Sequence, residues 1–184
     1  MRDPNVVAGI GDSMDVASRR LLVVRHAKSA WPAGVPDSAR PLGPRGLRDA
    51  PLMGRRIREL VGSVDVVVVS PTERTQQTWE LINEELGHTG PVRTDPRIYD
   101  AWGAHMLDLV TEFPEDARTA MILGHEPGVS ELVLSLVGST RDALRDRVAT
   151  KFPTCAVALL HAESPWAQFA PGCASLASFT TPRQ

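Results

Sequence analysis

The sequence predicts an α/β fold, in which helices cover both faces of a mainly parallel sheet. Short, continuously apolar runs alternate along the chain with longer segments whose apolar residues recur at helical spacing. Strands that are apolar on both faces are typical of parallel sheets buried between helices. With 184 residues, of which 42% are hydrophobic, the chain is long enough for one such domain and too short for two ordinary ones.

The strands are predicted from their apolar runs. Residues 21–24 read Leu-Leu-Val-Val, residues 64–69 are rich in β-branched valine, and residues 119–123 end in Met-Ile-Leu. Runs of this length and composition indicate fully buried strands. The remaining strand candidates are weaker, and they cover residues 91–94, 154–160 and 175–180.

The helices are predicted from spacing and from their end signals. Residues 45–61 place leucine and isoleucine among arginines as in an amphipathic helix, although Pro51 is unfavourable in its early turns. Pro71 suits the start of a helix that continues over residues 75–86 and stops at Gly87. Two further helices are expected over residues 104–113 and 128–137. The Pro- and Gly-rich loop of residues 31–44 is longer than a connector needs, and such loops are often functional.

Residues 1–18 are small, polar and acidic without periodicity, so we expect a disordered tail followed by a single domain over residues 19–184. Arg19 and Arg20 resemble a twin-arginine export signal, but only four apolar residues follow before the next arginine. An export signal needs a longer apolar segment, so we predict a cytoplasmic protein. The two cysteines, Cys155 and Cys173, show no CxxC spacing and fit a reduced compartment, with a single disulfide as the alternative.

The overall charge and hydropathy exclude two classes of partner. Twenty Lys and Arg residues against 22 Asp and Glu give a net charge of −2, which argues against nucleic acid as the main partner. No apolar run approaches the roughly 20 residues of a membrane span. The basic residues are nearly all arginine, whose forked guanidinium suits oxyanions, although a genome rich in Arg and Ala explains most of them.

Chemically active side chains follow three of the predicted strands. Arg25 and His26 come after residues 21–24, Arg74 lies in the segment after residues 64–69, and His125 follows residues 119–123. Ligands of parallel sheets collect beyond the carboxyl ends of the strands, so we expect these side chains to converge. Arginine forks bind phosphoryl oxygens, and a neutral imidazole can attack phosphorus. The sequence therefore predicts a phosphoryl-handling site.

Two histidines also raise the alternative of a metal site. A zinc ion would need a third protein ligand, such as Asp100 or Glu126. Two flanking arginines would repel a divalent cation. We therefore predict no metal and no cofactor.

Four segments carry a resemblance to a known family. Residues 22–29 (LVVRHAKS) resemble the Arg-His-Gly signature of the histidine phosphatase superfamily, in the Arg-His-Ala variant of the small SixA-type phosphohistidine phosphatases. The other three segments are residues 37–46 (DSARPLGPRG), similar to Asp-x-x-Arg-Pro-Leu-x-x-x-Gly; residues 69–78 (VSPTERTQQT), similar to Ser-Pro-x-x-Arg-x-x-x-Thr; and residues 123–128 (LGHEPG), similar to Gly-His-Asn-Pro-Gly with Glu126 in place of Asn.

The resemblance covers about residues 20–182 and implies a phosphoglycerate mutase-like, three-layer α/β/α sandwich without a required metal. It implies that His26 attacks a phosphoryl group and becomes a covalent phosphohistidine, which water then hydrolyses. Arg25, Arg74 and His125 would bind the phosphoryl oxygens. Lys28 and Ser29 could line the pocket entrance; a solvated lysine and a turn serine are equally compatible with the sequence.

The general acid is the open question, and with it the substrate. Glu126 and Asp100 are the candidates for protonating the leaving group, with structural carboxylates as the alternative for each; Glu73 better fits a helix start. A leaving imidazole, with a pKa of about 6.5, needs less protonation than an alkoxide. The substrate expected is therefore a phosphohistidine protein. A small-molecule phosphomonoesterase and a non-catalytic phosphate-binding regulatory module remain alternatives.

Overall fold

A computed structural model of the chain describes residues 18–138 and 143–183. The predicted tail of residues 1–18 lies, except for Ser18, outside the described residues. The strands of the described part are β1 (Arg19–Arg25), β2 (Val66–Val69), β3 (Val92–Thr94), β4 (Thr119–Gly124), β5 (Val157–Ala162) and β6 (Ser175–Thr180). Its helices are α1 (Pro44–Val61), α2 (Glu73–Leu86), α3 (Gly103–Thr111), α4 (Gly128–Val137) and α5 (Ala143–Thr150), with 3-10 turns η1 (Asp37–Ala39), η2 (Pro96–Ile98) and η3 (Trp166–Gln168).

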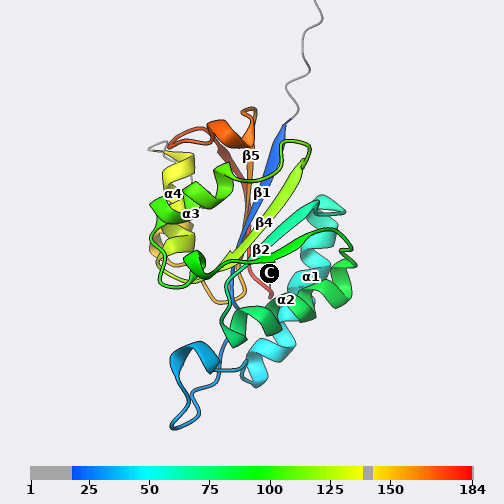
Figure 1. Ribbon diagram of the computed structural model, residues 1–184, viewed down its shortest axis with the longest axis vertical. Helices are drawn as coiled ribbons and strands as arrows, with labels where there is room; N and C mark the ends of the chain where they lie inside the picture. Colours follow the sequence, from blue (N-terminus) through cyan, green and yellow to red (C-terminus); the bar gives the residue numbers. More distant parts are fainter. Residues whose placement is uncertain (1–17, 139–142, 184) are drawn as a thin grey trace, which may run out of the picture.

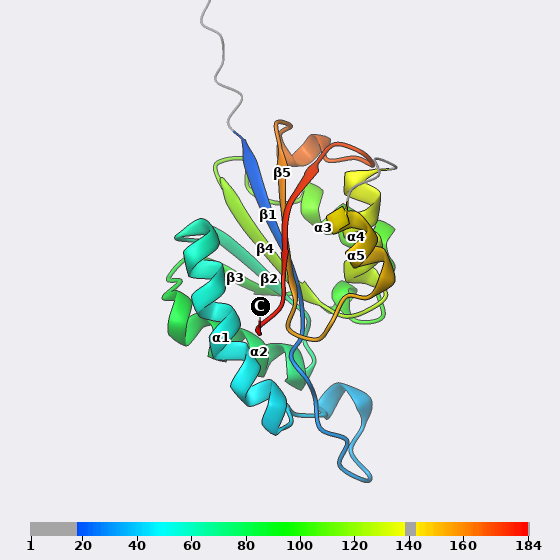
Figure 2. The ribbon, with the colours of Figure 1, turned by 180° about the vertical axis from the view of Figure 1, so that it is seen from behind.

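The six strands form one sheet in the order β3-β2-β4-β1-β5-β6. Strands β3, β2, β4 and β1 run parallel, whereas β5 and β6 are antiparallel to their neighbours. Helices α1 and α2 cover one face, and α3, α4 and α5 cover the other (Figures 1 and 2). The predicted α/β fold with a mainly parallel sheet is confirmed.

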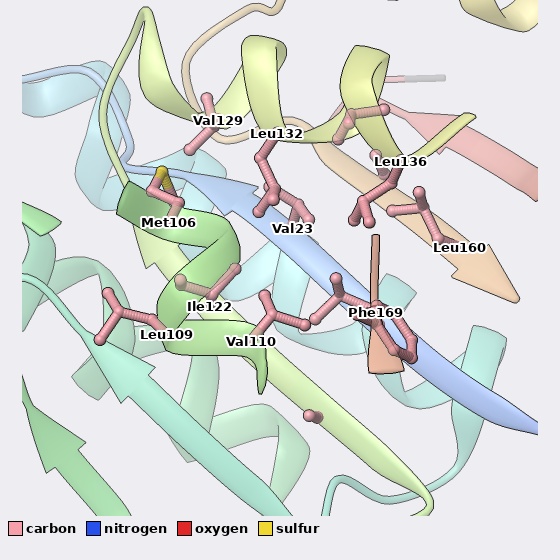
Figure 3. Close-up of a cluster of buried hydrophobic side chains, with 14 of the residues drawn as sticks. Val23, Met106, Leu109, Val110, Ile122, Val129, Leu132, Leu136, Leu160 and Phe169 are labelled. Atoms are coloured by element: carbon pink, nitrogen blue, oxygen red, sulfur yellow. The ribbon is translucent and has the colours of Figure 1, made fainter. Parts of the chain in front are cut away.

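The central strand β1 divides the core between the two faces of the sheet. Leu21 and Val23 join the apolar cluster beneath α3 and α4, which Figure 3 shows in close-up. Leu22 and Val24 join the cluster beneath α1 and α2. All four side chains have 0% exposure, which explains why the run is apolar at every position rather than at alternate ones.

Several element boundaries differ from the sequence-based expectations. Helix α1 continues through Pro51, and α2 begins at Glu73 instead of Pro71. The strand expected at residues 154–160 begins only at Val157, because Cys155 adopts a positive φ of 63° in the turn before it. Helix α5 was not predicted, because Val148 is its only buried residue and an apolar stripe is lacking.

The carboxyl ends of β1, β2 and β4 meet at one edge of the sheet. The long connection from β1 to α1 projects beyond this edge (Figure 1). Its base is closed by a bridge between Ser29 and Leu42. Nowhere in residues 18–138 and 143–183 does a helix have the length and apolar character needed to cross a membrane.

Candidate active site

The backbone around His26 is fixed by three neighbouring segments. The N–H of His26 donates to the carbonyl of Gly124 at the end of β4 (3.0 Å), and its carbonyl accepts from the N–H of Cys155 (3.0 Å). The N–H of Ala27 donates to Oγ1 of Thr78 on α2 (3.0 Å). The methyl group of Ala27 has 0% exposure and belongs to the core, so it takes no space from the site.

His26 is a buried, neutral imidazole of defined tautomer. Its Nδ1 lies 2.7 Å from the carbonyl oxygen of Ala27, which can only accept, so Nδ1 carries the proton. Nε2 is then the nitrogen with the available lone pair. Burial, reinforced by the charges of Arg74 and Arg25, lowers the pKa of His26 to about 4 although the Ala27 contact opposes this shift.

His125 lies beside His26, with 5.0 Å between the ring centroids. Its Nε2 is 2.8 Å from Oγ of Ser70 and 3.4 Å from Oγ1 of Thr72, two residues that follow β2. Burial and the neighbouring His26 lower the pKa of His125 to about 3. The buried Nδ1 has no hydrogen-bond partner in the part of the chain that the structure describes. The two imidazoles are thus neutral neighbours at the strand ends.

Arg25 and Arg74, the two arginines predicted for the site, lie on different elements. Arg25, the last residue of β1, donates from Nη1 to the carbonyl of Phe152 (2.6 Å), and its buried Nε is unpartnered among the described residues. Arg74 lies in the first turn of α2 and is only 6% exposed. Both contribute to the lowered pKa of each histidine, as cations close to the imidazoles do.

Asp37 and Tyr99 are neighbours of the site that the sequence did not single out as functional. The carboxylate of Asp37 accepts from Arg74 (2.9 Å) and from the Tyr99 hydroxyl (3.0 Å) on Oδ2, and from Arg40 (2.6 Å) on Oδ1. The ring of Tyr99 lies 5.7 Å from that of His125, edge to face. Asp37 belongs to the segment similar to Asp-x-x-Arg-Pro-Leu, which was the available signal.

Lys28 and Ser29 occupy different environments. The Lys28 side chain is exposed, and its backbone packs against the start of α1. Ser29 is buried, and its Oγ accepts from Nη2 of Arg40 (2.5 Å). The geometry therefore ties Ser29 to the loop that rims the site.

The carboxylates considered as general acids also differ. Glu126 is partly buried and accepts from Oγ of Ser130 (2.6 Å); burial raises its pKa, although Ser130 and the charge of Arg25 oppose the shift. Asp100 is exposed and adopts a positive φ of 56°. Glu73 is exposed and accepts from Gln77 on the surface of α2 (2.7 Å). Glu126 is thus the candidate whose surroundings favour a protonated carboxyl.

The described side chains do not form a metal-binding arrangement. Within residues 18–138 and 143–183, no three His, Cys, Asp or Glu side chains are grouped so that they could hold a metal ion. Both cysteines are free: Cys155 is buried, and Cys173 is partly buried.

Comparison with known proteins identifies the family. The family model of the histidine phosphatase superfamily (branch 1) matches residues 21–155. An uncharacterized protein of Mycobacterium tuberculosis, Rv1276c, is 39% identical over 165 residues, which cover 87% of this chain and 100% of that protein.

Solved structures agree with this assignment. A protein from Nakamurella multipartitia described as a SixA phosphohistidine phosphatase has a TM-score of 0.80 and 29% identity, covering 91% of this chain and 98% of that one. The protein histidine phosphatase SixA in complex with tungstate has a TM-score of 0.68 and 24% identity, covering 89% and 97%, and supports the fold. On its sequence and its fold, the chain belongs to branch 1 of the histidine phosphatase superfamily.

Proposed function

We propose that the protein is a metal-independent phosphohydrolase that works through a covalent phosphohistidine on His26, and that its substrate is a phosphohistidine protein. One observation carries the mechanism: two buried, neutral imidazoles lie 5.0 Å apart, and Arg25 and Arg74 lie close enough to lower both pKa values. This arrangement combines a nucleophile with fixed positive charge, which is what phosphoryl transfer requires.

In the first step, the lone pair on Nε2 of His26 attacks phosphorus, and the bond from phosphorus to the leaving group breaks. Arg25, Arg74 and His125 bind the phosphoryl oxygens as negative charge shifts in the transition state. A phosphoryl group also supplies acceptors for the unpartnered Nε of Arg25 and Nδ1 of His125. In the second step, water attacks phosphorus, the bond to Nε2 breaks, and neutral His26 and inorganic phosphate are released.

The leaving group connects the site to the substrate class. A phosphohistidine releases an imidazole with a pKa of about 6.5, so it demands little from a general acid. Among the candidate acids, Glu126 has the raised pKa, but Ser130 and Arg25 favour its ionised form. A phosphoramidate therefore suits the site with or without a proton from Glu126, whereas an alkyl phosphate requires that proton. The description of the similar Nakamurella protein as a phosphohistidine phosphatase supports the same substrate.

A small-molecule phosphomonoesterase is the second candidate. The half-buried Glu126 beside Arg25 is the observation that favours it, because a protonated Glu126 would assist the departure of an alkoxide. For either substrate we place the enzyme in the cytoplasm, and the two free cysteines support this location.

The mechanism is tested with His26→Ala. We expect this variant to lose turnover and to form no acid-labile phosphoenzyme from phosphoramidate. His88→Ala is the matched control, because Nδ1 of His88 also contacts a backbone carbonyl, that of Val64 (2.8 Å), outside the candidate site. Full activity in His26→Ala would disprove the mechanism. Loss of wild-type activity in a chelator, restored by a divalent ion, would contradict metal independence.

The substrate is tested by comparing phosphohistidine peptides, sugar phosphates and nucleotides as substrates of the wild-type protein. We expect the highest kcat/KM on a phosphohistidine peptide. A sugar phosphate or nucleotide that is hydrolysed faster would make the phosphomonoesterase the better description.

A further inference from the structure

The Asp37 contacts form a bidentate clamp on Arg74. The Asp37 side chain accepts from Nη2 of Arg74 (2.9 Å), and its main-chain carbonyl accepts from Nη1 (2.6 Å). A guanidinium held at both terminal nitrogens has little freedom to rotate. The clamp therefore fixes the plane of Arg74.

Asp37 is itself anchored on both sides. Arg40 donates to its Oδ1 (2.6 Å) and also to the carbonyl of Ala30 (3.1 Å), in the segment that follows His26. Tyr99, whose ring contacts that of His125, donates to its Oδ2 (3.0 Å). Asp37 thus joins the loop after β1, the start of α2 and the segment after η2. A carboxylate tied to three segments acts as a fixed support.

The contacts with Asp37 leave N–H donors of the same guanidinium for a phosphoryl group. An arginine side chain has five N–H donors, and the clamp uses two of them. The cation of Arg74 is only 6% exposed, so it depends on protein acceptors where water is excluded. Asp37 therefore compensates the buried charge of Arg74 without occupying all of its N–H donors. Asp37 is therefore better suited to support Arg74 than to compete with a phosphoryl group for its donors.

We propose that Asp37 is a positioning residue that orients Arg74 toward the phosphoryl group, and the proposal rests on the function proposed above. It assigns the loop between β1 and α1 a part in catalysis, although Asp37 need not touch substrate. A misaligned Arg74 loses most where charge develops, in the transition state. Removal of the clamp should therefore lower kcat more than it raises KM.

The test combines Asp37→Ala and Asp37→Asn with Arg74→Ala in a double-mutant cycle, assayed with p-nitrophenyl phosphate. We expect Asp37→Ala to lower kcat by about 10- to 100-fold. Vanadate, which mimics the transition state, should bind more weakly by a similar factor. In the Arg74→Ala background, Asp37→Ala should change kcat/KM by less than about twofold, because the residue it supports is gone. If Asp37→Ala does not fold, Asp37→Asn carries the same comparison.

Glu115→Gln is the matched control for a half-exposed carboxylate paired with a buried arginine. The Arg19–Glu115 pair has side-chain exposures of 10% and 48%, against 7% and 49% for Arg74–Asp37. This control should lower the melting temperature and leave kcat unchanged. Wild-type kcat in the Asp37 variants, tighter binding of inorganic phosphate, or an equal loss in the Arg74→Ala background would each overturn the proposal. If His26→Ala and Arg74→Ala remain active, the proposed function has failed instead.

Discussion

His26 shows how a single backbone contact decides which nitrogen of an imidazole keeps its lone pair. The Ala27 carbonyl holds the proton on Nδ1, and burial keeps the imidazole neutral. An ordinary surface histidine is substantially protonated just below pH 6.5, whereas His26 retains its lone pair until the pH approaches about 4. The nucleophilic role that we propose for His26 therefore depends on its surroundings.

The lowered pKa values of His26 and His125 predict a dependence of stability on pH. In the unfolded chain both imidazoles titrate near pH 6.5, and in the folded chain near about 4 and about 3. Between these limits the unfolded state binds more protons, so the free energy of unfolding falls as the pH is lowered from 6.5. Above pH 6.5 both imidazoles are neutral in the folded and in the unfolded chain, so their titration causes no loss of stability there.

Denaturant unfolding of the wild type and of His26→Gln at pH 7 and pH 5 measures the effect. The wild type should lose about 2 kcal/mol more than the variant between these two pH values. Both proteins keep every other titrating group, so the difference reports His26 together with its effect on the pKa of His125. Equal losses in the two proteins would show that His26 titrates normally in the folded state.

The role of the candidate acids depends on the leaving group. On a phosphohistidine peptide, Glu126→Gln and Asp100→Asn should each cost far less than the roughly 10²–10⁴-fold typical of losing a general acid. On an alkyl phosphate, Glu126→Gln should cost more, because an alkoxide must be protonated as it leaves. Asp100→Asn is the conservative control, since asparagine tolerates the positive φ of 56° at this position.

The ratio of the two activities in each variant is the measurement. A loss on phosphohistidine as large as that of His26→Ala would show that the acid is essential. The small-molecule phosphomonoesterase would then be the better description of the enzyme.

At the scale of elements, α1 supports the loop that carries His26 by direct backbone contact. A Cβ atom added at Gly46 would lie 2.3 Å from the Lys28 carbonyl oxygen. Gly54, later in α1, packs against α2 instead, where an added Cβ would lie 2.5 Å from the carbonyl oxygen of Ile82. These glycines allow close packing on two different partners.

This difference predicts different effects of two alanine substitutions. Gly46→Ala and Gly54→Ala should each destabilise the fold by about 1–3 kcal/mol through overpacking. Only Gly46→Ala should also lower kcat, by about tenfold, because displacing Lys28 misplaces the adjacent active-site loop. Thermal unfolding and kcat at a temperature where both variants are folded provide the comparison. Equal kcat values would argue against a rigid link between α1 and the loop.

The elements also show where sequence patterns succeed. Strands β1, β2 and β4 were predictable because burial on both faces demands apolar residues throughout. Helix α5 was not predictable, because it buries only Val148 and its sequence shows no apolar stripe. Pro51 was a misleading signal, because α1 continues through it. A proline has no N–H to donate to the carbonyl four residues earlier, which is that of the half-exposed Leu47.

For the whole molecule, local patterns predicted the sheet, and the sheet brought the site residues together. Arg25 ends β1, and His26 and His125 directly follow β1 and β4, two strands that pair, so their proximity follows from the fold class. The contact between Asp37 and Arg74 depends on the path of a long loop, which no periodic pattern specifies. The substrate class likewise depends on the loops that rim the site.

The central place of β1 has a consequence for how the enzyme folds. One neighbour pairs Arg25 with Gly124 and the other pairs Val24 with Val157, so the strand that leads into His26 has only partners that are distant in the sequence. Such non-local pairing forms late and slowly, because a long loop must close first. In stopped-flow refolding, vanadate binding should therefore return with the last phase of tryptophan fluorescence. Binding competence in an earlier phase would contradict this order. The same order predicts that a nascent chain brings His26 and His125 together only after β5 has been synthesised.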